Sequence, residues 1–321
     1  MAQVQRPFRF GISTRGFASS SEWRALARRV EALGYSTLLV PDHVAHPLAP
    51  ITLLAVAAEA TTTLRLGCHV FGNDFRHPVM LAKEAATLDV LSGGRVELGL
   101  GTGWQRDDYE TMGIPLDPPG VRVDRLAESL QIIKGCFGDE PFSFSGNHYT
   151  IRDLNLRPKP SQRPHIPILI GGGSRRVLGI AAREANIVAI NFRTTPDGGA
   201  DQSDITAEAT ERKLGWVRQA AGERIAELEL AVFAFLVSVT DEDPRLAIGT
   251  MMQRLPIGNR LDVDAALASP VALIGSVDQI VETLWSRREQ YGISYVVVRD
   301  QTGDGTIADA FAPVVARLAG R

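Results

Sequence analysis

The sequence has few of the features that mark a secreted, membrane-bound or nucleic-acid-binding protein. It has only two cysteines, Cys68 and Cys136, each inside a predicted strand or helix, where a buried reduced thiol is expected. No apolar run is long enough to cross a bilayer, and residues 1–10 lack the apolar stretch of a signal peptide. Charged residues, 34 Lys and Arg against 37 Asp and Glu, form no long run of one sign. We therefore expect a cytoplasmic protein that binds neither nucleic acid nor a membrane.

Lysine and grouped metal ligands are also scarce. The four lysines fall in predicted outer helices or in a loop, so none can serve as the strand lysine of a Schiff-base aldolase. Among the six histidines only His43 and His46 are close in sequence, and no acidic or cysteine partners are grouped near them. A G-x-S-x-G nucleophile elbow is absent. These absences argue against Schiff-base, catalytic-metal and nucleophile-elbow chemistry.

Short apolar runs typical of strands alternate with helical patterns along nearly the whole chain. The strands are expected at residues 8–12, 37–40, 64–70, 96–100, 168–170, 187–190, 228–239 and 295–298. The helices are expected at residues 21–33, 51–60, 79–91, 124–136, 174–184, 204–221, 277–291 and 307–318. Strands this apolar are covered on both faces, as parallel strands are. Eight such units favour an α/β fold of the (β/α)8 TIM-barrel type over a doubly wound sheet, with residues 1–321 as one domain.

One segment interrupts this alternation after the fourth helix. Between Pro141 and Arg157, aromatic and apolar residues on both sides of Gly146-Asn147 predict a small β-hairpin. The alternation of strands and helices resumes at residue 168. The hairpin is therefore expected to be an insertion into the barrel.

The carboxyl ends of the strands are where a (β/α)8 barrel carries its reactive groups. This position selects a small set of residues. They are Asp42, His43, His69, Gly101, Thr102, Gly103, Trp104, Gly171, Gly172, Gly173, Ser174, Asn191, Arg193, Arg299 and Asp300. Because they follow different strands, we expect them to surround one mouth of the barrel.

The run from Gly171 to Ser174 is the clearest of these candidates. Three glycines before a helix let backbone amides turn toward one point at the positive end of the helix dipole, which suits a phosphate. Arg175 and Arg176 add positive charge there. The alternative is a tight turn without a ligand. The run is neither a P-loop nor a G-x-G-x-x-G fingerprint, and residues 99–104 resemble that fingerprint only superficially, since Trp104 replaces its last glycine.

The pair Asp42-His43 follows the second strand. A histidine titrates near neutral pH and can give or take a proton beside a reacting carbon. The neighbouring carboxylate can orient the imidazole or hold the edge of a cofactor. The alternative is a helix-capping aspartate beside a structural histidine. The position at a strand end favours the functional interpretation.

Several stretches together resemble the bacterial luciferase-like monooxygenase family, in particular its branch that uses the deazaflavin coenzyme F420. The matching pieces are EALGY (31–35), VPDHV (40–44), LRLG (64–67), RHP (76–78), LAKEAATLD (81–89), SGGR (92–95), GLGTGW (99–104), and residues 122–130 and 167–173. Their order and spacing together are specific to this family. The similarity covers about residues 8–190 well and the last third loosely.

The resemblance implies roles for individual residues. Asp42 would touch the cofactor, and His43 would face the substrate. A bulge at His69-Val70, often with a cis peptide in this family, would support the ring from behind, with Gly72 nearby. The remaining cofactor contacts would be Thr102, Gly103 and Asp107 along the ring, and Gly171, Gly172, Gly173, Ser174, Arg176 and Val177 at the phosphate-side turn.

Trp104 departs from part of the family. The sugar-phosphate dehydrogenases of the deazaflavin branch carry a glutamate directly after the Gly-Thr-Gly turn, and an indole cannot exchange a proton as that carboxylate does. Oxidation of a phosphorylated sugar by the same mechanism is therefore not expected. An aromatic residue at this position suits an apolar or planar substrate. Trp104, Arg193 and Arg299 are accordingly the predicted residues of the substrate pocket.

The resemblance implies an F420-dependent oxidoreductase that transfers a hydride between the deazaflavin and a small organic substrate, with His43 as acid or base. Three alternatives remain open. An FMN-dependent monooxygenase would use reduced flavin and O2, supplied by a separate cofactor reductase. A non-redox TIM-barrel lyase or isomerase would bind a phosphorylated substrate at the glycine turn, and a cofactor-binding protein would lack catalysis. By analogy with the family, a homodimer is expected.

Overall fold

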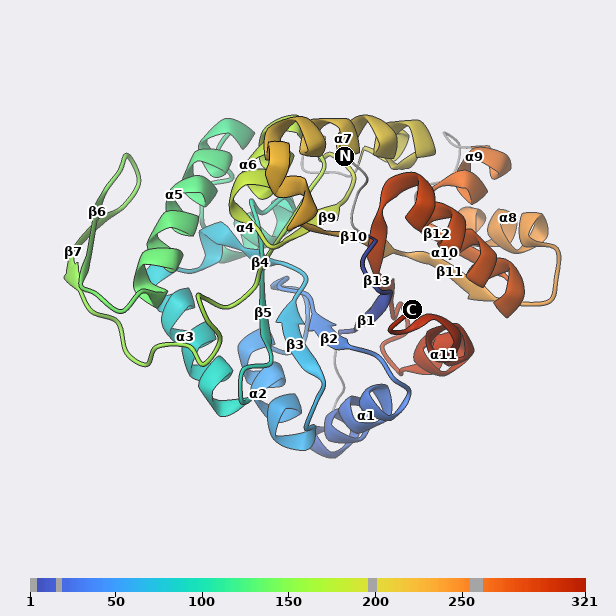
Figure 1. Ribbon diagram of the computed structural model, residues 1–321, viewed down its shortest axis with the longest axis horizontal. Helices are drawn as coiled ribbons and strands as arrows, with labels where there is room; N and C mark the ends of the chain where they lie inside the picture. Colours follow the sequence, from blue (N-terminus) through green and yellow to red (C-terminus); the bar gives the residue numbers. More distant parts are fainter. Residues whose placement is uncertain (1–4, 16–18, 196–200, 255–261) are drawn as a thin grey trace.

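Eight parallel strands pair in a closed ring at the centre of the computed structural model, which describes residues 5–15, 19–195, 201–254 and 262–321 (Figure 1). Around the ring they are β3 (Arg65–Cys68), β2 (Thr37–Val40), β1 (Arg9–Ser13), β13 (Ile293–Arg299), β10 (Glu229–Ala234), β9 (Ile187–Ile190), β8 (Ile168–Gly172) and β5 (Val96–Gly101). The pairing of Leu66 with Val96 joins β3 to β5 and closes the ring. The predicted TIM barrel is confirmed.

Helices cover the outside of the ring in Figure 1. They are α1 (Ser20–Ala32), α2 (Pro50–Ala60), α3 (Pro78–Leu91), α5 (Pro119–Phe137), α6 (Arg175–Glu184), α7 (Ala207–Ala221), α10 (Val277–Tyr291) and α11 (Thr306–Leu318). Sequence signals mark their starts: Ser19, Ser174, Thr206 and Ser276 accept bonds from backbone amides of the first helical turn. All eight predicted helices are present, and α5 begins five residues earlier than expected, at Pro119 rather than 124.

Two apolar layers hold the barrel together. The larger layer lies between the strands and the helices. The smaller one fills the interior of the ring, and its buried members are Leu39, Leu169, Ile187, Ala189, Ala231, Tyr295 and Val297. Val70 and Phe233 are partly buried against this interior layer. Because side chains fill the barrel, a ligand can enter only above these two residues.

The predicted strand over residues 228–239 is two strands, and this expectation was wrong. After β10 the amides of Phe235 and Leu236 both donate to the carbonyl of Val271, which draws the chain out of the ring. β11 (Leu236–Val239) then pairs in parallel with β12 (Ala272–Gly275) in a separate small sheet. The apolar pattern continues through the change of sheet, so periodicity could not reveal it.

Several short elements were not predicted. They are α4 (Arg106–Met112), α8 (Pro244–Arg254), α9 (Val263–Ala268), the strand β12 (Ala272–Gly275), the two-residue strand β4 (Phe71–Gly72), and the 3-10 turns η1 (Asn73–Phe75), η2 (Gln202–Ile205) and η3 (Gly222–Ala226). Of these, α4 and η1 bear on the functional site, because α4 follows β5 and η1 follows β4 at the carboxyl ends of the strands.

The inserted hairpin is confirmed as β6 (Phe142–Ser145) and β7 (Thr150–Leu154), which pair antiparallel. It projects from the left of Figure 1, beside α5. The carboxylate of Glu128 on α5 accepts bonds from the amides of Asn147, His148 and Tyr149 at the hairpin tip. The hairpin is therefore tied to the barrel by its tip as well as by its ends.

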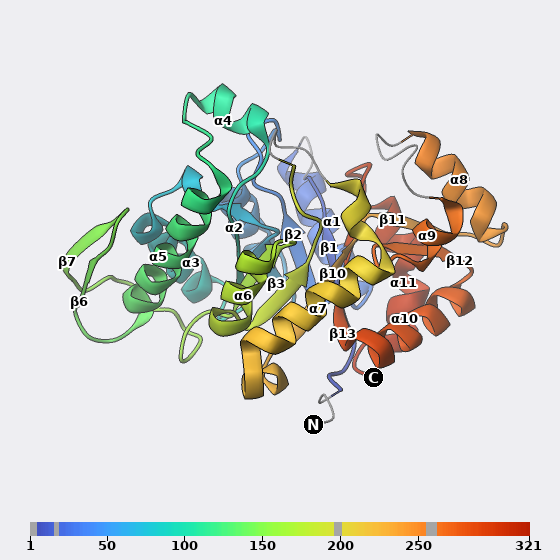
Figure 2. The same cartoon turned by 90° about the horizontal axis from the view of Figure 1, so that it is seen from above.

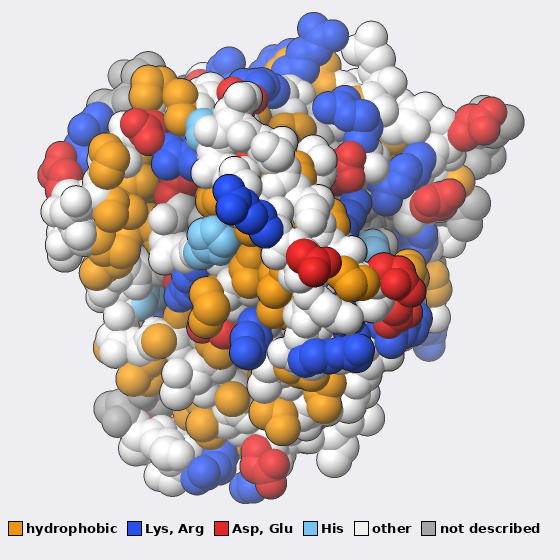
Figure 3. All heavy atoms as spheres, turned by 90° about the vertical axis from the view of Figure 1, so that its left-hand side faces the viewer, with side chains coloured by type: hydrophobic (Ala, Val, Ile, Leu, Met, Phe, Trp, Pro, Cys, Tyr) orange, Lys and Arg blue, Asp and Glu red, His pale blue; other side chains and the backbone are white. Residues whose placement is uncertain are grey.

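Figure 3 shows the face that carries this hairpin, where apolar side chains lie between charged ones. The most exposed large apolar residues on α3 are Met80, Val90 and Leu91, with Leu91 at 72% exposure.

The predicted homodimer and the single domain over 1–321 stay predictions. Within the described ranges, no helix is both long and apolar enough to span a membrane.

The two ends of the barrel differ in character. Figure 2 shows both termini on one side of the molecule and α4 on the other. At the terminal side, Phe8 exchanges backbone hydrogen bonds with Gly320 and Arg321. At this amino end of the strands Glu97, which is buried, accepts bonds from Arg9 Nη1 and Arg65 Nε, both at 2.7 Å. Arg9 also binds Glu229.

The Glu97 carboxylate therefore links β1, β3 and β5 at the base of the barrel. We predict that Glu97→Ala lowers the free energy of unfolding at pH 7 by about 3 kcal/mol, because it leaves two arginines without their shared partner. Urea denaturation measures this change. As a control, Glu110→Ala removes an exposed carboxylate near Arg106 and should cost less than about 0.5 kcal/mol. Equal losses in the two variants would contradict the assignment.

The effect of Glu97→Ala on stability should also depend on pH. Burial alone raises the pKa of Glu97, but the charges of Arg9 and Arg65 outweigh it and leave the pKa below the usual 4.5. A carboxyl with a lowered pKa in the folded state stabilises the protein above its unfolded pKa and loses this contribution as pH falls through the folded value. The difference in stability between wild type and Glu97→Ala should therefore shrink below about pH 4.

Candidate functional site

A cavity of about 640 Å³ opens at the carboxyl ends of the barrel strands, within the size range of small-molecule sites. Fifteen of the seventeen residues with a predicted catalytic, cofactor or substrate role line it. They are Asp42, His43, His69, Val70, Gly72, Thr102, Gly103, Trp104, Gly171, Gly172, Gly173, Ser174, Val177, Arg193 and Arg299. The other strand-end candidates, Gly101, Asn191 and Asp300, line it as well. The structure thus brings together residues that lie up to 257 positions apart in the sequence (Asp42 to Arg299).

Two predicted residues lie outside the cavity lining. Asp107 is exposed at the start of α4, and its neighbour Asp108 lines the cavity instead. Successive residues on a helix point about 100° apart, so only one of the two can face the barrel. The Arg176 side chain is also exposed and pairs with Asp124 of α5 rather than turning toward the glycine run. Neither side chain lines the cavity, and their predicted contacts with a cofactor stay predictions.

The cavity floor is a bulge between β3 and β4. The peptide bond between His69 and Val70 is cis, as the resemblance implied. Two glycines of β5 make room for this bulge. A Cβ on Gly101 would lie 2.6 Å from Cγ2 of Val70, and a Cβ on Gly99 would collide with the carbonyl oxygen of Cys68.

Asp42 anchors the same bulge from the second strand. Its carboxylate accepts bonds from both terminal nitrogens of Arg76, at 2.6 and 2.9 Å, and from the amide of Gly72 at 3.0 Å. A bidentate pair with arginine fixes the geometry of a carboxylate. Asp42 therefore holds β4 and the turn after it in place beneath the cavity. Its predicted contact with a cofactor stays a prediction.

His43 is oriented by a buried carboxylate. Its Nδ1 lies 2.6 Å from Oδ2 of Asp108, which is 2% exposed, and Oδ1 of Asp108 accepts the amide of Val44 at 2.9 Å. A carboxylate at Nδ1 favours a proton on that nitrogen. The other ring nitrogen, Nε2, is then left to exchange a proton with a ligand.

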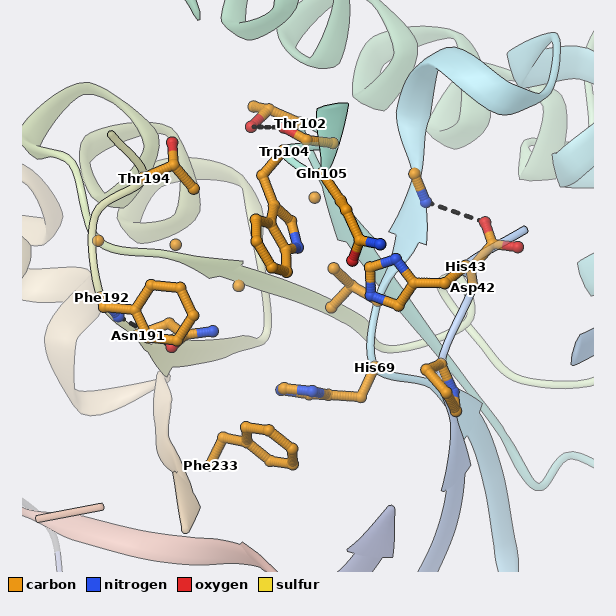
Figure 4. A pocket seen from close by; sticks show the side chains of 18 of the residues that line it. Asp42, His43, His69, Thr102, Trp104, Gln105, Asn191, Phe192, Thr194 and Phe233 are labelled. Carbon is orange, nitrogen blue, oxygen red and sulfur yellow. Dashed lines mark hydrogen bonds between the residues drawn. The ribbon is translucent and has the colours of Figure 1, made fainter. Parts of the chain in front are cut away.

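Aromatic rings form a connected series around the cavity. The contacts run from His43 to Trp104, Phe192, Phe235, Phe233 and finally His69, with ring centroids 4.6–6.3 Å apart. Figure 4 shows His43, Trp104, Phe192, Phe233 and His69 around one central space. Burial lowers the pKa of His69 to about 4, so this ring is neutral at pH 7. We call these six residues the aromatic belt.

The glycine run forms the opposite wall of the cavity from β1. Ser174 caps α6 by accepting the amide of Val177. The first amides of any helix have no carbonyl partner within it, and they form the positive end of the helix dipole. Gly173 lies so close to the backbone of Phe192 and Arg193 that a Cβ would collide with it. The run therefore brings backbone, rather than side chains, to this wall.

The sequence analysis missed several residues of the site. Among them are Asp108, Phe192, Phe233 and Phe235, and also Arg15, His46 and Arg122. Asp108 and Phe192 directly neighbour candidates that were chosen, so the strand-end signal pointed to the correct loops. Phe233 and Phe235 lie in one long apolar run, where an aromatic ring facing a cavity looks the same as one in the core. No group of acidic, histidine and cysteine side chains suited to a metal ion occurs in the described part of the chain.

The closed ring and the cavity at the strand ends define the class: a (β/α)8 barrel with a small-molecule site at its mouth. Within that class the chain belongs to the luciferase-like monooxygenase family, whose family model matches residues 7–248. The match runs from β1 into α8 and so covers seven of the eight barrel strands, all but β13.

Individual relatives support the same placement. An uncharacterised Mycobacterium tuberculosis protein is 34% identical over 181 residues, 49% of this chain and 61% of the relative, so the match spans less than two thirds of it. The 4-hydroxyprotoasukamycin monooxygenase of Streptomyces nodosus subsp. asukaensis is 28% identical over 300 residues, 85% of this chain and 78% of that one. The FMNH2-dependent dimethylsulfone monooxygenase of Pseudomonas putida is 34% identical over 132 residues, 41% and 36% of the two chains.

A solved structure supports the fold. The coenzyme F420-dependent tetrahydromethanopterin reductase from Methanopyrus kandleri superposes with a TM-score of 0.77, over 98% of this chain and 100% of that one. Its sequence is 18% identical, so the likeness concerns the arrangement of the elements alone.

The link between Asp42 and Arg76 can be tested through stability. We predict that Arg76→Met lowers the free energy of unfolding by about 2–3 kcal/mol, because Asp42 stays buried with a single amide as donor. Arg29→Met, which breaks an exposed pair with Asp309, should cost less than about 1 kcal/mol. Urea denaturation of both variants provides the comparison. Similar losses would show that the pair of Asp42 and Arg76 contributes no more to stability than an exposed ion pair.

Proposed function

We propose that the protein is an oxidoreductase that binds coenzyme F420 in this cavity and transfers a hydride between the deazaflavin and a small organic substrate. One observation carries the proposal. The bulge at His69-Val70, the glycine run and the His43–Asp108 pair all face one cavity at the mouth of the barrel. No single element would suffice without the other two.

The residues present fit a planar redox cofactor with a phosphate. The bulge and the aromatic belt provide flat apolar surfaces for a ring system. The amides at the start of α6 provide donors for a phosphate across the mouth from β1. Thr102 and Gly103 lie between these two regions at the end of β5. The cavity of about 640 Å³ has room for a ring and a small substrate.

The chain itself handles the proton. When bound, F420 supplies the hydride donor or acceptor, and the protein supplies binding, orientation and proton transfer. Asp108 holds the proton of His43 on Nδ1, so Nε2 accepts a proton from an alcohol or, once protonated, gives one to a carbonyl oxygen. Trp104 packs edge-on against His43, with centroids 5.8 Å apart, and limits the directions from which water reaches the imidazole.

A second candidate is a monooxygenase that uses reduced FMN. The names of two relatives favour it, since both are monooxygenases and one is FMNH2-dependent. The same cavity would hold the ring and phosphate of FMN, and a separate reductase would have to supply the reduced flavin. A non-redox lyase or isomerase has less support, because the two sequence relatives named above with an activity are both monooxygenases. The cytoplasmic location and the homodimer remain predictions.

A paired cofactor titration separates the two candidates. We predict that F420 binds the purified protein with a Kd in the micromolar range or below and that FMN binds at least tenfold more weakly, because the proposed function requires F420 (about 1.4 kcal/mol for each tenfold). The fluorescence of each cofactor gives the measurement. Tight binding of FMN without binding of F420 would favour the monooxygenase. Binding of neither would overturn both candidates.

The role of His43 can be tested with two variants. We predict that His43→Ala keeps the Kd for cofactor within several-fold but lowers turnover by about 10²–10⁴, the usual contribution of a general acid or base. Turnover is measured as reoxidation of reduced F420 by the first carbonyl compound found active in a screen. An unchanged turnover would remove His43 from the mechanism.

Asp108→Asn provides the matched comparison, because Asp108 influences proton transfer through its bond to His43. The variant should lower kcat by about 10² or more, with little change in KM, because an amide does not hold the proton on Nδ1. A merely structural role for Asp108 would change stability without this separation of kcat from KM.

A further inference from the structure

Four arginines line the cavity, and two of them are already engaged. Arg122 donates to the carbonyl oxygens of Gly103 and Asp117. Arg193 pairs with Asp201 and Asp204. The other two, Arg15 and Arg299, have no hydrogen-bond acceptor or ion-pair partner among the residues that the structure describes. Their positive charges are therefore available to a ligand or to residues outside the described ranges.

The carboxylates of the cavity cannot supply that partner. Asp42 is held by Arg76, Asp108 by His43, and Asp201 by Arg193. The fourth, Asp300, directly follows Arg299 in the sequence. Its oxygens accept the hydroxyls of Thr14 and Thr302 and the amides of Gly303 and Gly305. The acidic groups are therefore satisfied, and the wall at Arg15 and Arg299 keeps an excess of positive charge.

The two arginines lie across the mouth from the glycine run. Arg299 ends β13, and Arg15 lies two residues after β1, which pairs with β13. In the ring of eight strands, β1 is the fourth neighbour of β8 in either direction, so it stands opposite the strand that carries the glycines. A phosphate held by the glycine run cannot also reach the arginines. The cavity therefore has two separate positive ends, with the aromatic belt between them.

His46 lies beside the arginines. Its Nδ1 is buried and has no hydrogen-bond partner in the described part of the chain. Burial and the neighbouring His43, Arg15 and Arg299 lower the pKa of His46 to about 4, so it is neutral at pH 7. Burial and Arg15 also lower the pKa of Arg299. A ligand suited to this place carries a negative charge, which offsets the neighbouring positive charges, and accepts hydrogen bonds.

We propose that Arg15 and Arg299 form an anion subsite for the substrate, which is an organic acid with an apolar or aromatic body. This inference rests on the proposed function, because it assigns the glycine run to the phosphate of the cofactor. The acidic group, a carboxylate or a sulfonate, binds between the two guanidinium groups. The apolar body lies along the aromatic belt, beside Trp104 and above the bulge at Val70. This arrangement places the reacting carbon within reach of His43.

Binding of simple probes tests the subsite directly. The probes are 2-naphthoate, naphthalene-2-sulfonate and the neutral 2-naphthylmethanol, which share a flat apolar body and differ in charge. Isothermal titration calorimetry at low ionic strength gives their Kd values, with and without F420. We expect both anions to bind about 10- to 100-fold more tightly than the alcohol, the usual effect of charge-assisted hydrogen bonds. Added salt should reduce this preference.

Arginine variants assign the preference to residues. Arg299→Gln should remove most of the preference for the anions, about tenfold in Kd or more, while the Kd of 2-naphthylmethanol changes less than twofold. Arg15→Gln should act in the same direction, and Arg299→Lys should retain part of the effect. Arg24→Gln, which removes an equal charge from the exposed side of α1, is the matched control and should change neither Kd.

The outcomes separate this inference from the proposed function. Equal affinity for naphthoate and naphthylmethanol in a protein that binds F420 would overturn the subsite and leave the function standing. Anion binding that depends on Arg299 in a protein that binds neither cofactor would overturn the function. A loss of F420 affinity in Arg299→Gln as large as the loss for naphthoate would show that the arginines hold the cofactor's acidic tail, and this result would also overturn the subsite.

Discussion

The contact between the bulge after β3 and the glycines of β5 is the constraint on which the site depends. Val70 can turn into the mouth of the barrel only because Gly99 and Gly101 have no Cβ. The bulge then sets the depth of the cavity, since it lies directly on the packed interior of the ring. Asp42 and Arg76 fix the same bulge from the side. Backbone geometry, rather than any single reactive group, thus decides where a ring system can lie.

The charges are arranged differently at the two ends of the barrel. At the amino end, Glu97 is shared by Arg9 and Arg65, so the charges balance and bind neighbouring strands together. At the carboxyl end, each acidic group that lines the cavity is matched within the chain, but Arg15 and Arg299 are not matched by any described residue. This difference agrees with the general division of such barrels into a stabilising end and a functional end.

The sequence predicted the barrel because short apolar runs alternate with helical patterns eight times along the chain. It predicted the loops of the site because strand ends converge in a parallel barrel. It could not distinguish Asp108 from Asp107, since the direction of a side chain on α4 depends on where that helix begins. It also could not separate β10 from β11, because an apolar run looks the same when it passes from one sheet to another. The sequence also could not predict which charged residues pair, as Asp42 does with Arg76, because pairing depends on distances in the folded structure.

The bond from Asp108 to His43 and Val44 joins the loop after β5 to the loop after β2. The first of these loops also carries Trp104, which faces the same cavity. The residue that shapes the cavity and the residue that orients the acid–base histidine therefore lie on one segment of the chain. Replacement of residues 102–112 would therefore alter which molecules fit and, in the same step, how the imidazole of His43 is held. A new specificity on this scaffold would thus arise together with a change in proton transfer rather than independently of it.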